Sequence, residues 1–288
     1  MRYSIAFAAA ALASSVSAHG VITQVQGANG VNMPGLSLID GTPRDSGNPL
    51  SGSEADTSII RAKEMGGKAS ALGRTQGGGP VDAGAAIAKF MGTGGAGGAA
   101  AAANNKRGLL DALTGGKGGK GGAAASAGTK TPKGTKENGV AAAAGQGATS
   151  GLPTTADDGT ITMTFHQVNQ DGAGPLKAAI DATSGGTDPA AFQAATVTQD
   201  VPGIGIGGLS AAAVMDFPVK VQMPQGMTCQ GTAGGAQNVC VVRMQNAALA
   251  GPFGGSAAFT QSTQAKKRAV EYNLRKRHMA RGILGKPE

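Results

Sequence analysis

A regular alternation of polar and apolar residues over 160–168 constrains the fold of this chain most strongly. In the string TITMTFHQV the side chains of Ile161, Met163 and Phe165 fall on one face, and three threonines and His166 fall on the other. A repeat of two residues is the period of a β-strand. This segment is therefore predicted to be a strand with one face in the core.

Further strands are predicted between turns that are rich in glycine and proline. They cover residues 19–25, 217–223, 238–245 and 256–261. Proline lacks the N–H that a β-ladder uses, so Pro218 and Pro224 predict that the segment 217–223 lies at a sheet edge or ends there. Short strands separated by such turns predict an all-β fold, an antiparallel β-sandwich.

Two segments break the strand pattern. Residues 94–150 consist mainly of glycine, alanine and lysine. They bury too little apolar area to offset the entropy of ordering, so a long disordered, cationic insert is predicted, with a short helix over 106–113 as an alternative. Residues 263–288 form a basic tail whose helix formers predict a helix over 265–284. The remaining parts, 19–93 and 151–262, are expected to form a single sandwich domain, with a helical turn or two over 58–65 and a short helix over 81–91.

The net charge of +8 is unevenly distributed. The insert holds seven basic and two acidic residues, and the tail holds eight and two. The predicted sandwich domain holds nine basic and thirteen acidic residues, so it is mildly acidic. The basic isoelectric point therefore does not indicate that the folded body binds nucleic acid.

Residues 1–18 have the pattern of a secretory signal peptide. Arg2 gives the positive start, an apolar run follows, and Val16-Ser17-Ala18 gives a small-residue cleavage site. We expect a secreted, extracellular or cell-surface protein without a transmembrane segment, because no other stretch is long and apolar enough to span a bilayer. In that compartment Cys229 and Cys240, the only cysteines, are predicted to form a disulfide.

Cleavage after Ala18 would make His19 the first residue of the mature chain. Such a residue offers both an amine and an imidazole to a metal, and an amine pKa of about 7.7–8.0 allows deprotonation near neutral pH. With one more imidazole, three nitrogens would form a site suited to Cu(II). His166 is the best candidate for this third nitrogen. In the alternative interpretation, His166 only forms hydrogen bonds on a polar sheet face and the cleavage position is a coincidence.

Aromatic residues limit the chemistry further. The expected N-terminal histidine resembles that of copper-dependent monooxygenases, in which a Tyr or Phe usually occupies the axial position. This resemblance implies Phe253 or Phe259 here, because residues 19–262 contain no tyrosine. Phe259 and Gln261 share one strand face and are the candidate catalytic residues, although a core role is the alternative for each phenylalanine. The body also lacks tryptophan, which argues against tight binding to crystalline cellulose or chitin. Serine-hydrolase and zinc-protease motifs are absent from the sequence.

Several strings occurring in order give a family resemblance. They are GTPRD (41–45), LGRTQGGG (72–79), SGLPTTADDGTITMTFHQVNQDGAGP (150–175), DFPVKVQMPQGMTC (216–229) and NVCVVRMQNAALAGPFGGSAAFTQ (238–261). Together they resemble the secreted fungal Egh/Mas proteins, which are appressorium-associated cell-surface proteins linked to infection. The resemblance implies secretion and a role at the host surface. The expected N-terminal His-Gly also resembles copper-dependent lytic polysaccharide monooxygenases, which implies an immunoglobulin-like or monooxygenase-like sandwich with a two-histidine copper site.

Two functions remain open. The first is a virulence-associated, copper-dependent oxidoreductase that acts on cell-wall polysaccharide through His19 and His166. The second is a non-catalytic adhesive or masking protein of the cell wall or host surface, anchored by the cationic insert and tail. In both cases we expect a monomer that does not bind nucleic acid.

Overall fold

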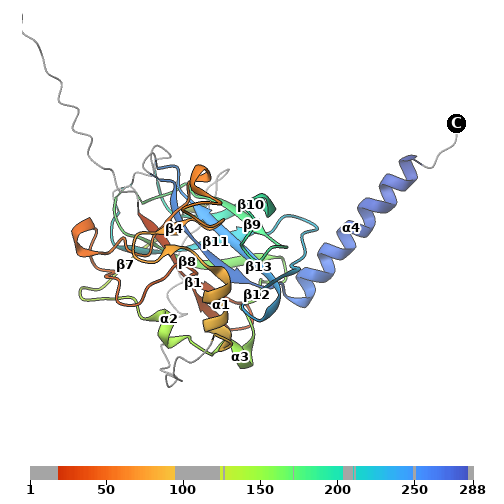
Figure 1. Cartoon of the computed structure of the whole chain (residues 1–288). Coiled ribbons are helices and arrows are strands. Elements are labelled where there is room, and N and C mark those ends of the chain that lie inside the picture. The colour runs from red at the N-terminus through yellow and green to blue at the C-terminus, as the bar shows by residue number, and fades with distance from the viewer. Residues whose placement is uncertain are drawn as a thin grey trace, which may run out of the picture.

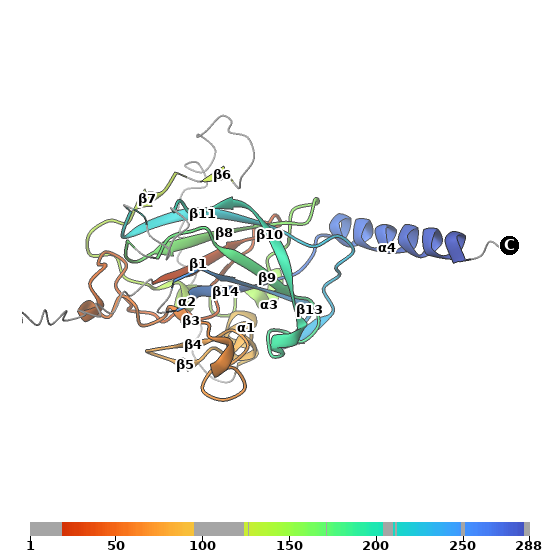
Figure 2. The same ribbon diagram turned by 90° about the horizontal axis from the view of Figure 1, so that it is seen from above.

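A computed structural model of the chain describes residues 19–94, 124–125, 127–170, 172–203, 210, 212–248 and 251–284. The strands among these residues form one extended β-sheet that folds back on itself (Figures 1 and 2). The predicted signal peptide and the possible helix over 106–113 lie outside the described residues.

The main sheet path joins eleven strands. In spatial order they are β2 (Asn32–Pro34), β1 (Gly20–Gln26), β8 (Thr160–Gln167), β11 (Met215–Gln222), β10 (Phe192–Asp200), β9 (Lys177–Asp181), β13 (Ala236–Gln245), β14 (Phe253–Phe259), β3 (Ser58–Ile59), β4 (Arg74–Thr75) and β5 (Gly79–Pro80). Every neighbouring pair along this path for which a register is described is antiparallel. Three short strands lie beside it: β6 (Ala124–Ala125), β7 (Thr129–Lys130) and β12 (Gly231–Ala233). The predicted all-β class is confirmed.

The sheet bends at β10 and closes where β14 packs on β1. The first half of β10 pairs with β9 and its second half pairs with β11, so one strand belongs to both sides of the fold. At the closure, Leu36 N–H donates to the Ser256 carbonyl, and a Cβ at Gly255 would lie 2.6 Å from the backbone nitrogen of Ile22. Glycine is needed there because a side chain would separate the two strands.

Because the sheet curves round between these two points, it has the shape of a half-barrel. The hydrophobic core fills the interior of this half-barrel. The predicted inward face of β8, namely Ile161, Met163 and Phe165, is fully or almost fully buried in it. Aliphatic side chains and methionines supply most of the remaining volume, as the scarcity of aromatic residues requires. Strands β9 and β10 were not predicted, because β9 is alanine-rich and both lack a marked alternation of apolar residues.

Helix α1 (Ala83–Met91) begins and ends with recognisable caps. The Asp82 side chain accepts a hydrogen bond from the Ala85 N–H, and Gly92 ends the helix in the left-handed region at φ 72°. Ile87 and Phe90 bury one face of the helix in the core. In the region 58–65, one helical turn is present as a 3-10 turn over Ala62–Glu64, and strand β3 occupies the start of the region.

The expectation that Pro218 marks an edge strand is wrong. Strand β11 lies between β8 and β10. On the side of β11 that faces away from β8, residues 220–222 pair with β10 and residues 215–216 pair with β7. Pro218 lies between these two stretches. The missing N–H of the proline therefore falls where the described ladder is interrupted.

The predicted insert 94–150 includes an ordered part over residues 127–150. This part contains β7, α2 (Gly139–Ala142) and α3 (Gly147–Ser150). The carboxylate of Asp40 accepts hydrogen bonds from the backbone N–H groups of Val140 and Ala141 in α2, and Glu137 forms an ion pair with Arg44. Composition alone did not reveal these anchors, because their partners lie about a hundred residues earlier in the chain.

The tail forms helix α4 (Thr263–Leu284), which projects from the body (Figures 1 and 2). Its first turns are attached to the body through the buried side chains of Ala265 and Ala269, and Asn273 Nδ2 donates to the carbonyl of Gly226. In the part of the chain that the structure describes, no helix has the length and apolar character needed to cross a membrane.

The predicted disulfide between Cys229 and Cys240 is present. It links β13 to the segment before β12, and both half-cystines are buried.

Candidate metal centre

The ladder between β1 and β8 brings the two body histidines to the same end of this strand pair. Val21 lies directly opposite His166. His19 comes directly before β1, and its carbonyl accepts a hydrogen bond over 3.0 Å from the N–H of Val168, which comes directly after β8.

The backbone and ring of His19 face a polar pair made by Glu54 and Asn169. The His19 backbone nitrogen donates to Asn169 Oδ1 over 2.8 Å, and Asn169 Nδ2 donates to Glu54 Oε1 over 3.0 Å. His19 Nδ1 lies 3.1 Å from the same Glu54 oxygen, but the contact is not aligned as a hydrogen bond. The backbone nitrogen and Nδ1 of His19 therefore both face the pair of Asn169 and Glu54.

The His166 ring is held by a carboxylate on the neighbouring strand. Asp216 lies directly opposite His166 in the β8–β11 ladder, and its Oδ1 is 2.7 Å from His166 Nδ1. A carboxylate on one ring nitrogen fixes the tautomer that leaves the other nitrogen free to bind a metal. Here that other nitrogen is Nε2.

Unpartnered ring nitrogens provide a direct test of whether a metal fits. His19 is 2% exposed and His166 is fully buried. Nevertheless, Nε2 of each ring and Nδ1 of His19 have no hydrogen-bond partner among the described residues. Buried polar atoms are normally satisfied, so such atoms on two neighbouring histidines fit a site for a further group. The described residues contain no cluster of three His, Cys, Asp or Glu side chains that could hold a metal, but a site with two rings and an amine needs only two such residues.

Two glycines allow the N-terminal residues to lie close to the body. A Cβ at Gly172 would be 2.0 Å from the carbonyl oxygen of His19, and a Cβ at Gly20 would be 2.5 Å from the ring of Phe165. Neither contact leaves room for a side chain without displacing the backbone beside His19.

The structure places Phe253, and not Phe259, beside His19. The His19 and Phe253 ring centroids are 4.3 Å apart with the planes tilted by 38°. Phe259 lies at the other end of β14, about 20 Å along the strand, and is buried in the main core. Gln261 accepts a hydrogen bond from Cys229 N–H and donates to the Met227 carbonyl. The candidate catalytic pair Phe259 and Gln261 is thus not brought together with the histidines.

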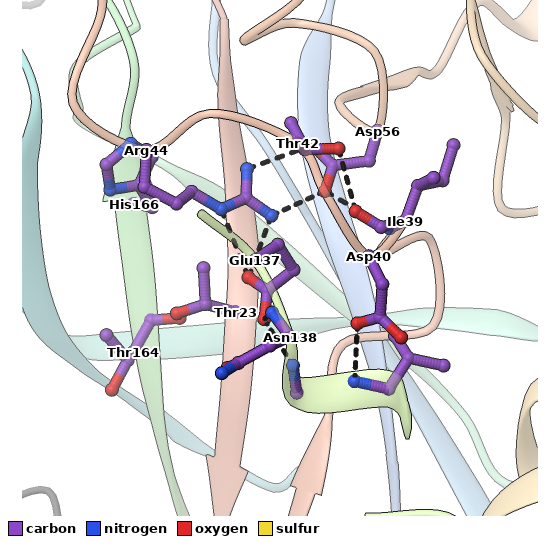
Figure 3. A network of polar contacts seen from close by, with 12 residues as sticks. Thr23, Ile39, Asp40, Thr42, Arg44, Asp56, Glu137, Asn138, Thr164 and His166 are labelled. Carbon is purple, nitrogen blue, oxygen red and sulfur yellow. Dashed lines mark hydrogen bonds and ion pairs between the residues drawn. The ribbon is translucent and has the colours of Figure 1, made fainter. Parts of the chain in front are cut away.

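A buried ionic network joins the loop 39–57 to residues 135–138. The guanidinium of Arg44 contacts the carboxylates of Asp56 and Glu137, and Figure 3 draws this network together with His166. Burial alone would lower the pKa of Arg44, but the two carboxylates outweigh burial and raise it above its ordinary value. Arg44 therefore remains charged and is neutralised by this pair of acids.

Three polar residues of this region were not found from the sequence: Glu54, Asn169 and Asp216. Asp216 is fifty residues from His166, and Glu54 is over a hundred residues from Asn169. No local motif links them, since only strand pairing brings them together.

Fold and site together define a β-sheet protein with two buried histidines at adjacent strands, beside a carboxylate and an amide. Comparison with known proteins identifies the family to which the chain belongs. The chain matches the Egh16-like virulence factor family over residues 17–254, and it belongs to that family. The resemblance predicted from the sequence strings is confirmed.

Two relatives come from the fungus Pyricularia oryzae. The chain is 59% identical over 285 residues to the appressoria-specific virulence factor GAS2. This alignment covers 98% of the present chain and 97% of GAS2. It is 40% identical over 131 residues to the appressoria-specific virulence factor GAS1. This alignment covers 44% of the present chain and 51% of GAS1. No solved structure matches the chain significantly.

Proposed function

We propose that this chain is a secreted virulence-associated protein whose processed form binds Cu(II) through His19 and His166 and oxidises cell-wall polysaccharide. One observation carries the proposal: two histidines at the same end of the β1–β8 pair are buried, and each has an unpartnered ring nitrogen. Removal of residues 1–18 would add the His19 amine as a third nitrogen. Nitrogen ligands of this kind suit Cu(II).

Each residue then has a defined task. His19 chelates through its amine and Nδ1, and His166 offers Nε2. Asp216 fixes the tautomer and orientation of the His166 ring. Phe253 packs against the His19 ring and limits its rotation. Copper would supply the one-electron chemistry that activates oxygen or peroxide, while the strands fix the ligand positions.

Calorimetric titration with Cu(II) tests the binding step. The processed protein beginning at His19 is compared with a form that carries one additional glycine before His19, because a peptide bond removes the amine. His166→Ala removes the second ring, and His278→Ala on exposed α4 is a matched histidine control. We expect tight binding in wild type and H278A, and at least a tenfold loss in the extended form and H166A. Equal binding by all four proteins would contradict the proposal.

Turnover needs its own measurement. The copper-loaded protein is incubated with soluble and acidic wall polysaccharides, a reductant and peroxide, and products are identified by mass spectrometry. Oxidised oligosaccharides from wild type and none from H166A would support catalysis. Copper binding without oxidised products would leave a copper protein that is not this enzyme.

A second function, adhesion, is favoured by the geometry of α4. The helix leaves the body after a few turns, and its exposed surface carries most of the basic residues of the tail. Such a cationic arm would bind anionic wall polymers with a strength that falls as salt rises.

Removing residues 274–288 tests adhesion while it retains Ala265, Ala269 and Asn273, which contact the body. If the arm is an anchor, the shortened protein should be washed from wall material at lower salt than the full chain. Identical elution of both forms would exclude this role of α4.

A further inference from the structure

A hollow lies where helix α4 meets the body, between the first turns of the helix and the turn 223–227 that follows β11. Its volume is about 380 Å³, which is in the range of small-molecule binding pockets. Asp158 and Gly159, just before β8, also line it. His166 is near the other end of β8, about 20 Å along the strand, so the hollow is separate from the histidines.

The helix supplies this hollow with an aromatic ring that the body lacks. Tyr272 is the only tyrosine besides Tyr3, and the chain has no tryptophan. The Tyr272 ring lies against Gly226, where a Cβ would be 2.8 Å from Tyr272 Cδ1 and φ is 80°. Tyr272 is 40% exposed, so part of its ring remains open to a ligand.

The turn that faces the ring is held from several directions. Asn273 donates to the Gly226 carbonyl from the helix, and Gln261 Nε2 donates to the Met227 carbonyl over 2.9 Å. Gln261 Oε1 accepts from the N–H of Cys229, which is fixed by its disulfide. A wall that is already rigid loses little conformational entropy when a ligand binds.

The hollow combines apolar surface with free polar groups. The ring of Tyr272 and the two methionines of the turn give the apolar surface. Among the described residues that line the hollow, only Asp158 and Arg268 are charged, so the charges balance. The side chains of Gln225 and Arg268 are exposed and have no hydrogen-bond partner among the described residues, so both can reach a ligand.

We infer that this hollow binds a short, neutral oligosaccharide. A pyranose ring has an apolar C–H face that packs on an aromatic ring, and a rim of hydroxyls that donate to a carboxylate and accept from a guanidinium or an amide. The balanced charges favour such a ligand over a polyanion. The inference goes beyond the proposed function, because it needs neither copper nor the part of α4 after Asn273.

Tyrosine emission measures binding at this hollow alone, because Tyr272 is the only tyrosine in residues 19–288 and tryptophan is absent. Processed protein is titrated with laminarihexaose, cellohexaose and chitohexaose, and with hexagalacturonate as the charged comparison. We expect a saturable change of emission with a neutral hexasaccharide. The dissociation constant should vary little between about 0.05 M and about 0.5 M salt, because the ligand has no charge to screen.

Two variants locate the binding site by calorimetry. Tyr272→Ala removes the ring, and Arg268→Ala removes an exposed donor that makes no hydrogen bond or ion pair with the described residues and so leaves the fold intact. We expect a dissociation constant about tenfold larger or more in each. Leu274→Ala is the matched control, because Leu274 is an exposed apolar residue of the same helix outside the hollow, and it should bind like wild type.

Three results would overturn the inference. The first is that no neutral hexasaccharide binds. The second is that only hexagalacturonate binds, with a strength that falls as salt rises, which would indicate electrostatic attachment to the basic helix. The third is equal affinity in wild type, Y272A and R268A, which would place the binding elsewhere. Since the titrations contain no copper, their failure is independent of the metal-binding proposal.

Discussion

Asp216 Oδ1 lies 2.7 Å from His166 Nδ1, and the two residues are directly opposite each other in the β8–β11 ladder. The pair is fixed by backbone pairing as well as by its own contact. His166 thereby presents Nε2 in a single orientation. The stability of the sheet and the orientation of a potential ligand thus depend on the same register.

Loss of this carboxylate should weaken metal binding. We expect Asp216→Asn to raise the Cu(II) dissociation constant by about tenfold, because an amide no longer enforces the tautomer that leaves Nε2 free. Titration calorimetry on processed protein measures the change. Asp188→Asn is the control, since Asp188 caps a short turn over Pro189–Ala191 on the surface. Unchanged affinity in D216N would show that Asp216 does not prepare His166.

Arg44 should be a major contributor to stability. Replacement by alanine leaves Asp56 and Glu137 as buried, uncompensated carboxylates, and such a loss costs about 3–5 kcal/mol. Urea unfolding followed by circular dichroism measures the free energy. Arg61→Ala is the matched control, because the Arg61–Glu64 pair is more exposed to solvent. A similar loss in both variants would contradict the special role of the buried network.

Asp181 should make stability depend on pH in the acid range. Burial alone would raise the pKa of its carboxyl, but hydrogen bonds from Ser184, Thr183 and Gly186 outweigh burial and hold the pKa below its ordinary value. The unfolded chain therefore takes up the proton first. The stability that Asp181 contributes is complete above about pH 4 and is lost as pH falls through the lower, folded-state pKa.

Asp181→Asn tests this linkage. At pH 7 we expect a loss of about 2–4 kcal/mol, because several donors lose a charged acceptor. Between pH 5 and pH 3 the difference between wild type and D181N should shrink, because the unfolded chain takes up the proton before the folded one. Urea unfolding at both pH values gives the two differences. A gap that stays constant or widens on acidification would contradict the assigned pKa direction.

The disulfide should stabilise the fold measurably. Cys229 and Cys240 are separated by 11 positions, and closing such a loop contributes about 3 kcal/mol in the chain-entropy model. We expect the double variant C229A/C240A to melt at a lower temperature than wild type. A reducing agent should lower the melting temperature of wild type and leave the variant unchanged, which separates loss of the bond from other effects of the substitutions.

The fold was predictable where its signal is local. The alternation in 160–168 identified β8 and its buried face, and glycine and proline turns bounded β1, β13 and β14. Strands β9 and β10 were missed, because the former is rich in alanine and neither displays a regular apolar repeat. The ordered part of the insert was missed for a different reason: Glu137 is anchored by Arg44, and no nearby residue reveals that contact.

For the candidate site, the sequence by itself predicted the two histidines: His19 after a predicted cleavage site, and His166 on the polar face of its strand. Only the tertiary structure decided which residues surround them. It placed Phe253 at His19 and Phe259 in the core, and it supplied Glu54, Asn169 and Asp216 from separate segments. The physical reason is that the alternation of side chains along a strand depends only on the local backbone and can be read from the sequence. Strand register and loop packing join residues many positions apart, so they depend on the whole fold.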